Sequence, residues 1–183
     1  MFGRCKKSGF TLIEIMVVIL IIGLLATIAP PLFRGMRPAA ERETFITQLN
    51  GLTKSALVDA LKTGKIHGIT FFIEKKRVEL GGYAGKRNLP PTQKTLSNAV
   101  IKIPKQLEIK NFYVEGKDEL ARYGAKGSKE IWFFVFPQGF SQAVIINMYD
   151  TKDKIGGRRN RPIGLVLNPF SVQFEVYNEF KKP

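Results

Sequence analysis

One carboxylate stands inside the most apolar stretch of this 183-residue chain. Twenty residues run from Phe10 to Ala29, and Glu14 is the one charged residue among them. A helix of that length spans roughly 30 Å, the thickness of the hydrocarbon core of a bilayer. An ionised side chain within a bilayer is costly unless it is paired or reaches the interface. The stretch therefore predicts a membrane anchor in which Glu14 has either a partner or access to the interface.

The residues on either side of this stretch indicate its orientation. Arg4, Lys6 and Lys7 precede it without an acidic residue, which favours a cytoplasmic N-terminus. An ordinary secretory signal peptide has an apolar region of about 7–15 residues, followed by a small-residue cleavage site. Here the apolar stretch is longer and Pro30-Pro31 follows it, which argues against an ordinary signal peptide. Two adjacent prolines are expected to end or kink the helix at the outer membrane surface.

A second group of residues could bind anions. The formal charge of the chain is +14, and one segment, "DTKDKIGGRRNRP" at 150–162, predicts a charged loop. Its five basic residues are Lys152, Lys154, Arg158, Arg159 and Arg161. Such a charge excess is typical of a solvated surface that attracts anionic membrane headgroups. The alternative is a nucleic-acid partner, whose phosphates these five side chains would contact.

Residues for metal or covalent chemistry are sparse. Cys5 is the one cysteine and precedes the apolar stretch, so the remaining chain has neither a disulfide nor a thiolate site. Asp150 and Asp153 stand alone in a basic segment, whereas calcium needs several converging oxygen ligands. His67 is the one histidine and has no catalytic motif nearby, which favours a packing or surface role. We expect no enzyme activity, no metal and no cofactor.

The residues "KKSGFTLIE", 6–14, resemble the type IV prepilin signal of type IV pilins and of type II secretion and competence pseudopilins. The resemblance implies that residues 1–9 are a leader, that a prepilin peptidase cleaves after Gly9, and that Phe10 becomes N-methylated. Cleavage would create an α-amine at Phe10 with an ordinary pKa of about 7.7–8.0. Glu14 lies one helical turn from Phe10, so in a filament it could pair with the amine of a neighbouring subunit and fix the stagger. The alternative is that Glu14 only reaches the nearby interface.

The remaining pattern predicts a head of residues 31–183 behind a transmembrane, filament-core helix of residues 10–30. Apolar residues recur at helical spacing from 38 to 62, with Gly64 just beyond. Alternating β-rich segments follow: a hairpin over 65–80, a strand over 99–109 with Pro104 at an edge or bulge, and two strands over 131–149 in which Trp132 faces the core. Residues 81–93 and 115–130 predict loops, and a last hairpin turns at Asn168–Ser171. The fold class is therefore α+β, the pilin-like fold of a long N-terminal helix packed on an antiparallel β-sheet.

The head is similar to minor pseudopilins of the GspH type and to the related minor pilin FimT. The stretches "LNGLTKSALVDALKTGKIHGITFFI", "FVFPQGFSQAVII" and "NPFSVQFEV" carry this looser resemblance, while the loops 81–98 and 150–161 depart from it by being unusually basic. It implies a minor pseudopilin of a type II secretion system, single-pass in the bacterial inner membrane with its head in the periplasm. Its partners would be the prepilin peptidase and other pseudopilins in a hetero-oligomeric filament. The alternative is a minor type IV pilin or competence pseudopilin that binds DNA for uptake.

Overall fold

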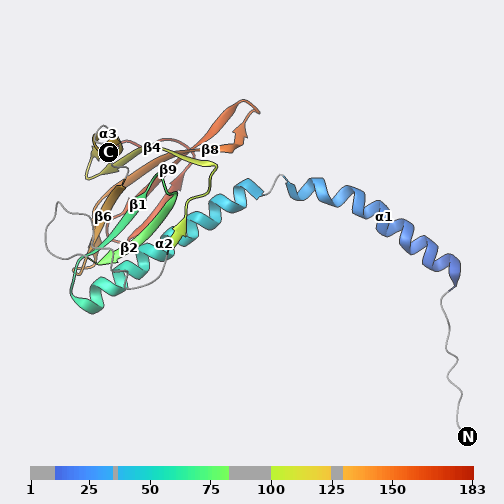
Figure 1. Cartoon of the computed structure of the whole chain (residues 1–183), viewed down its shortest axis with the longest axis horizontal. Coiled ribbons are helices and arrows are strands. Elements are labelled where there is room, and N and C mark those ends of the chain that lie inside the picture. The colour runs from blue at the N-terminus through green and yellow to red at the C-terminus, as the bar shows by residue number, and fades with distance from the viewer. Residues whose placement is uncertain (1–10, 35–36, 83–99, 125–129) are drawn as a thin grey trace, which may run out of the picture. The chain divides into compact units, whose positions relative to one another are not determined.

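The computed structural model describes residues 11–34, 37–82, 100–124 and 130–183 (Figure 1). The chain divides into two compact units, Met1–Arg37 and Pro38–Pro183. The predicted processing residues Gly9 and Phe10 lie outside the described residues, as does most of the loop predicted at 81–93.

The described part of the first unit includes the helix α1 (Leu12–Arg34). It continues through Pro30 and Pro31 for three further residues, so these prolines do not end the helix, and the alternative expectation of a kink stays a prediction. Proline is tolerated in a helix at a cost, because it removes one backbone donor and crowds the preceding turn. Over the part of the chain that the structure describes, no helix has the combined length and apolar character of a membrane span.

The second unit begins with α2 (Arg37–Thr63), where the sequence predicts a helix over 38–62. Its buried apolar side chains recur every three or four residues, which places them on one face of the helix; they are Phe45, Leu49, Leu52, Ala56 and Ala60. The helix ends at Gly64, whose φ of 65° suits glycine and whose N–H donates to the carbonyl of Ala60 at 2.9 Å.

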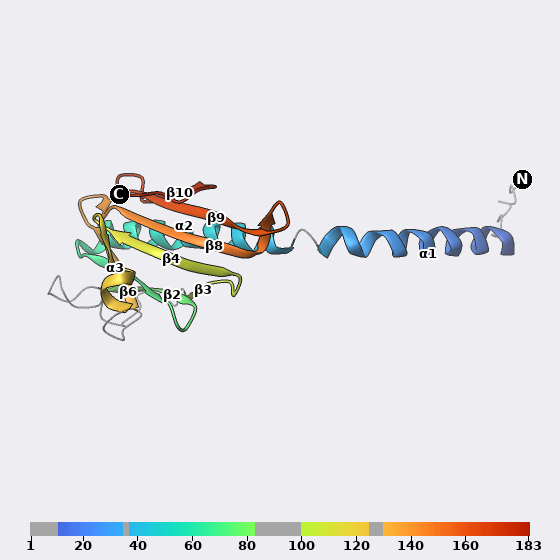
Figure 2. The ribbon, with the colours of Figure 1, turned by 90° about the horizontal axis from the view of Figure 1, so that it is seen from above.

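Within the described residues, the strands form two antiparallel five-stranded sheets, where the sequence predicted one (Figure 2). The first sheet has the order β3 (Val100–Lys102), β2 (Arg77–Gly82), β1 (His67–Phe72), β6 (Glu130–Phe136), β7 (Phe140–Ser141). The second has the order β10 (Gln173–Tyr177), β9 (Arg159–Asn168), β8 (Val144–Ile155), β4 (Leu107–Val114), β5 (Lys117–Asp118). The α+β class is thereby confirmed.

One core joins α2 to both sheets. Phe45 of α2, Phe71 and Phe133 of the first sheet, and Phe112 and Ile146 of the second are all almost completely buried in it. Phe71 and Phe112 meet edge to face with ring centroids 5.0 Å apart, which is a favourable arrangement for aromatic quadrupoles. The two sheets are therefore held together by side-chain packing between them.

Three segments differ from the sequence prediction. The strand expected over 99–109 is two strands, β3 and β4, and each belongs to a different sheet. A turn at Pro104 separates them, in which the Leu107 N–H donates to the Pro104 carbonyl at 3.0 Å. The loop expected over 115–130 contains β5 and the short helix α3 (Glu119–Gly124). Trp132, expected in the core, is only partly buried, whereas its neighbour Phe133 is fully buried.

The C-terminal segment lies against the second sheet. The side-chain amide of Asn147 donates to the Lys181 carbonyl at 2.8 Å, and the Lys181 N–H donates to Asn147 Oδ1 at 3.0 Å. Gly164, the partner of Asn147 across β8 and β9, leaves room for this segment, because a Cβ there would lie 2.5 Å from the Glu179 carbonyl oxygen.

Candidate functional site

The described part of the predicted processing region begins with a helix cap. Glu14 Oε2 accepts hydrogen bonds from the Thr11 N–H at 3.3 Å and from Thr11 Oγ1 at 3.5 Å. The Glu14 N–H donates in return to Thr11 Oγ1 at 3.3 Å. This reciprocal pattern is a capping box, which satisfies donors that a helix N-terminus otherwise leaves free. Glu14 therefore already has a partner within its own chain, which the sequence prediction did not consider.

From Leu12 to Leu24, the helix that follows this cap exposes its apolar side chains on every face. The large apolar residues from Leu12 to Leu24 are between 48 and 73% exposed. A helix that is apolar all round is stable only where something other than water surrounds it. Lipid tails or the helices of other subunits could supply these surroundings, so this surface is a candidate assembly site.

The basic residues of the head lie on a β-hairpin, so the prediction of a charged loop at 150–162 is wrong. β8 and β9 continue pairing as far as Ile155 and Arg159, and Figure 1 shows their ends projecting beyond the rest of the sheet. Gly156 and Gly157 form the turn with φ values of 60° and 73°. Two successive positive φ angles are what a type I′ hairpin turn requires, and a Gly-Gly pair is a recognised signal for it.

Four of the five predicted basic residues are exposed on this hairpin: Lys152, Lys154, Arg158 and Arg159. Arg161 differs, because its Nε donates to Asp153 Oδ2 at 2.7 Å. Its charge is therefore already compensated within the head. The structure thus brings together four of the predicted anion-binding residues and assigns Arg161 to an internal ion pair.

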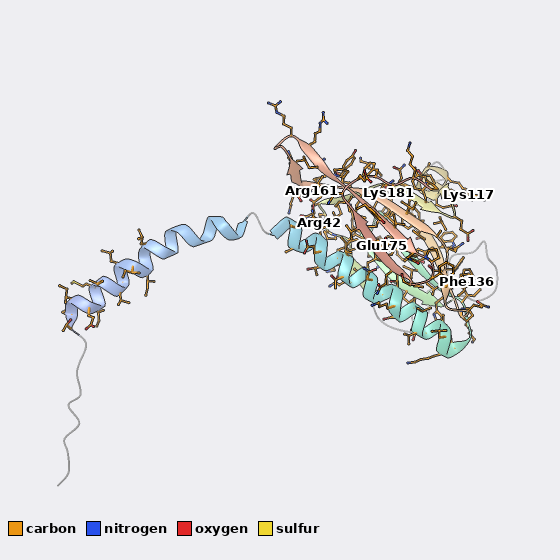
Figure 3. The ribbon with its side chains drawn as sticks, turned by 180° about the vertical axis from the view of Figure 1, so that it is seen from behind. Arg42, Lys117, Phe136, Arg161, Glu175 and Lys181 are labelled. Carbon is orange, nitrogen blue, oxygen red and sulfur yellow. The ribbon has the colours of Figure 1, made fainter. Side chains whose placement is uncertain are left out.

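The base of the hairpin is tied to α2 by an ion network that centres on Arg42 (Figure 3). Arg42 Nη1 contacts Asp153 Oδ2 at 2.8 Å and Asp150 Oδ2 at 3.3 Å. The Asp150 side chain is completely buried, and its Oδ1 accepts the N–H groups of Lys152 and Asp153 at 3.1 Å each. These two bonds lie where the pairing of β8 with β9 shifts register, between Asp150 and Lys154.

The same network affects the ionisation of Asp153. The hydrogen bond from Arg42 lowers the pKa of Asp153 below its ordinary 3.8, and Arg161 adds to the effect, while burial opposes it. Hydrogen bonds from cations favour the ionised carboxylate. The sequence prediction missed Arg42, because no local signal links a residue of α2 to a hairpin more than a hundred positions later.

His67 is a packed residue of β1. Its Nε2 lies 3.1 Å from Thr63 Oγ1 at the end of α2, and burial lowers its pKa below the ordinary 6.5. Its Nδ1 is buried without a hydrogen-bond partner among the described residues. Within the same described ranges, no group of three His, Cys, Asp or Glu side chains could hold a metal ion.

Comparison with known proteins gives matches of three kinds. Residues 4–30 match the prokaryotic N-terminal methylation motif. The fimbrial protein EcpB of Eikenella corrodens is 46% identical over 61 residues, which cover 33% of this chain and 38% of the fimbrial protein. The minor pseudopilin EpsH from the type 2 secretion system of Vibrio cholerae is 10% identical with a TM-score of 0.43, over 76% of this chain and 94% of that one. The chain is thus similar to proteins that carry the N-terminal methylation motif and, over about a third of each length, to a fimbrial protein.

Proposed function

We propose that the chain is a minor pseudopilin of a type II secretion system, a non-enzymatic subunit of a periplasmic filament that drives protein export across the outer membrane. The observation that carries the proposal is the apolar surface of α1, which is exposed on every face from Leu12 to Leu24 behind a methylation motif. Before assembly, this surface would be buried in the bacterial inner membrane as a single-pass anchor with the head in the periplasm. After assembly, it would be buried among the helices of other pseudopilins.

Processing would make Glu14 available for assembly. Cleavage by a prepilin peptidase after Gly9 gives Phe10 a cationic amine, and methylation keeps that charge. In the filament, Glu14 would exchange its bonds to Thr11 for the amine of a neighbouring subunit. Both charges gain, because an ion pair in apolar surroundings costs less than two isolated ions.

A pilus role is the second candidate. The similarity to a fimbrial protein and the exposed Lys152, Lys154, Arg158 and Arg159 support a minor type IV pilin or competence pseudopilin that captures DNA. Deleting the gene in the native host separates the two functions. Loss of exoprotein secretion with intact pili and DNA uptake would favour the pseudopilin, whereas the reverse result would favour the pilin.

The first experiment is the intact mass and N-terminal sequence of the protein purified from membranes of its native host. A chain that begins at N-methylated Phe10 is expected. A chain that still begins at Met1 would refute both candidate functions, since each requires processing.

The role of Glu14 is tested by two substitutions with different effects on the cap. Glu14→Gln keeps the capping box, in which glutamine can replace glutamate, but removes the charge. Thr11→Val removes the cap, at an expected cost of about 0.5–2 kcal/mol of helix stability, but keeps the charge. We expect Glu14→Gln to be processed normally and to be absent from sheared filaments, while Thr11→Val still assembles. The opposite pattern would mean that Glu14 acts only as a cap.

A further inference from the structure

The basic hairpin lies at the end of the head where the chain enters from α1. Arg42, which holds the base of the hairpin, is on the second turn of α2. α2 begins at Arg37, three residues after α1 ends at Arg34, and three residues span at most about 11 Å. A bilayer that holds α1 would therefore be joined through the chain to the end of the head at which α2 begins.

The tip of the hairpin has the composition of a membrane-surface contact. Lys152, Lys154, Arg158 and Arg159 are exposed, and Ile155 is an apolar residue that is 47% exposed at the turn itself. Basic residues that surround an exposed apolar side chain are typical of segments that lie at the headgroup boundary. The acidic residue of this stretch, Asp153, is neutralised by Arg42 and Arg161 and does not oppose an anionic surface.

The hairpin is also held in place before it meets a ligand. The Arg42 network fixes its base, and the backbone N–H groups of Lys152 and Asp153, which donate to the Asp150 carboxylate, fix the bulge below the tip. A segment that is already ordered loses little conformational entropy on binding. Weak individual contacts to headgroups can therefore be sufficient for the hairpin to bind a membrane surface.

We propose that the tip of the β8–β9 hairpin binds anionic phospholipid headgroups of the membrane that anchors the chain. This inference rests on the proposed membrane-anchored function. Each Lys or Arg near an anionic surface contributes on the order of fivefold to binding. The anchor keeps the tip at a high effective concentration beside the bilayer, so the contact forms while α1 is in the membrane and is lost when α1 is extracted into a filament.

Nucleic acid is the less favoured ligand for this surface. The segment 152–161 contains no aromatic residue on which a base could stack. A DNA partner would also have to be captured from solution, whereas the anchor would tether the hairpin to the membrane. DNA is therefore an outcome of the test below.

The test uses the full chain in vesicles of phosphatidylcholine, with or without one third phosphatidylglycerol. Ile155→Cys, in a Cys5→Ser background, carries a fluorophore at the tip. Phe170→Cys is the matched control, because it is exposed at the β9–β10 turn, about 30 Å away along β9 at 3.3 Å per residue. The measurement is collisional quenching by a neutral water-soluble quencher.

We expect phosphatidylglycerol to reduce quenching at position 155 at least threefold at low salt and to leave position 170 unchanged. About 1 M salt should restore quenching, because the Debye length falls to about 3 Å. Replacing the four exposed basic residues with glutamine should abolish the protection.

Equal quenching at position 155 in both kinds of vesicle would overturn the proposal. Protection by a DNA duplex in phosphatidylcholine vesicles, without protection by phosphatidylglycerol, would also overturn it and would favour the pilin that captures DNA. Alkaline extraction of the same vesicles reports on the anchor separately. A chain that washes off refutes the membrane-anchored function, whereas one that stays inserted with an unprotected tip refutes the hairpin contact alone.

Discussion

Replacing Arg42 with alanine is expected to destabilise the head by removing the cation shared by Asp150 and Asp153. In the native head, Arg42 Nη1 lies 2.8 Å from Asp153 and 3.3 Å from Asp150. Asp150 is completely buried and would keep only the two backbone N–H groups that its other oxygen accepts. Asp153 would keep Arg161. The substitution therefore costs most at Asp150.

The size of the destabilisation by Arg42→Ala follows from the burial of the ion pair with Asp150. Removing one partner of a fully buried ion pair costs about 3–5 kcal/mol. The Arg42 side chain retains 15% exposure, so water can replace part of the lost contact, and we expect about 2–3 kcal/mol. For a head of this size, that corresponds to a fall in Tm of about 6–10 °C.

The assay is thermal and urea unfolding of residues 38–183, the compact unit in which all the buried core residues of the described structure lie. Glu108→Ala is the matched control, because Glu108 and Lys110 form a 3.5 Å pair in which both side chains are about half exposed. Exposed pairs contribute about 0.2–1 kcal/mol. A second variant, Asp153→Asn, tests coupling, since its effect and that of Arg42→Ala should not add in the double variant.

A fall in Tm of less than 2 °C for Arg42→Ala would refute this reasoning. It would mean that water or a rearranged side chain satisfies Asp150, and that the hairpin does not need α2 to hold it. The basic tip would then not be held in place before it binds a ligand.

Three further predictions concern separate parts of the head. Hydrogen bonds from Arg42 and Arg161 lower the pKa of Asp153. Its contribution to stability is therefore complete above about pH 4 and is lost as the pH falls through the lower folded-state pKa. Urea titrations between pH 5 and pH 2.5 would detect this loss. Burial lowers the pKa of His67, so the free energy of unfolding should fall as the pH drops below about 6.5. His67→Gln should remove this dependence on pH between pH 7 and 5. The same dependence on pH in the variant would contradict a buried neutral ring. Gly164→Ala should displace the C-terminal segment at the Glu179 carbonyl, so carboxypeptidase should release the last residues faster. Gly51→Ala is the control and should have no such effect, because its new Cβ meets no neighbouring residue within 4 Å.

Local periodicity was sufficient to predict α2. The buried positions Phe45, Leu49, Leu52, Ala56 and Ala60 follow one another at helical spacing, and a glycine ends the helix. All of this information lies within one segment, and the core needs the same face that the periodicity indicates. The α+β class could be predicted for the same reason, because the alternation of apolar and polar residues lies within each strand.

The number of sheets could not be predicted in this way. Residues 99–109 alternate as one strand, yet β3 pairs with β2 in one sheet and β4 pairs with β8 in the other. Alternation shows which side chains share a face, but not which strand lies alongside. That choice depends on contacts such as Phe71 with Phe112, which join residues far apart in the chain.

The hairpin shows the same limit at the candidate site. Charged residues from 150 to 162 suggested a loop, although Gly156-Gly157 was a local signal for a tight turn. The bulge at Asp150 and the guanidinium of Arg42 meet at the base of the hairpin, although they come from different elements. A charge pattern alone therefore predicted the basic surface but neither its backbone conformation nor the separate role of Arg161.

The head and α1 would contribute differently to the proposed assembly. The head buries its own core, whereas the described part of α1 leaves its apolar side chains exposed. Moving α1 from a bilayer into a bundle of helices exchanges one apolar environment for another, so the hydrophobic effect favours neither strongly. The polar groups must therefore supply much of the preference. Glu14 is the charged residue of the apolar stretch, and a neighbouring amine would stabilise it in a way that lipid tails do not. Under the proposed function, Glu14 would therefore determine whether α1 is more stable in the bilayer or in the filament, while its apolar surface would be compatible with both.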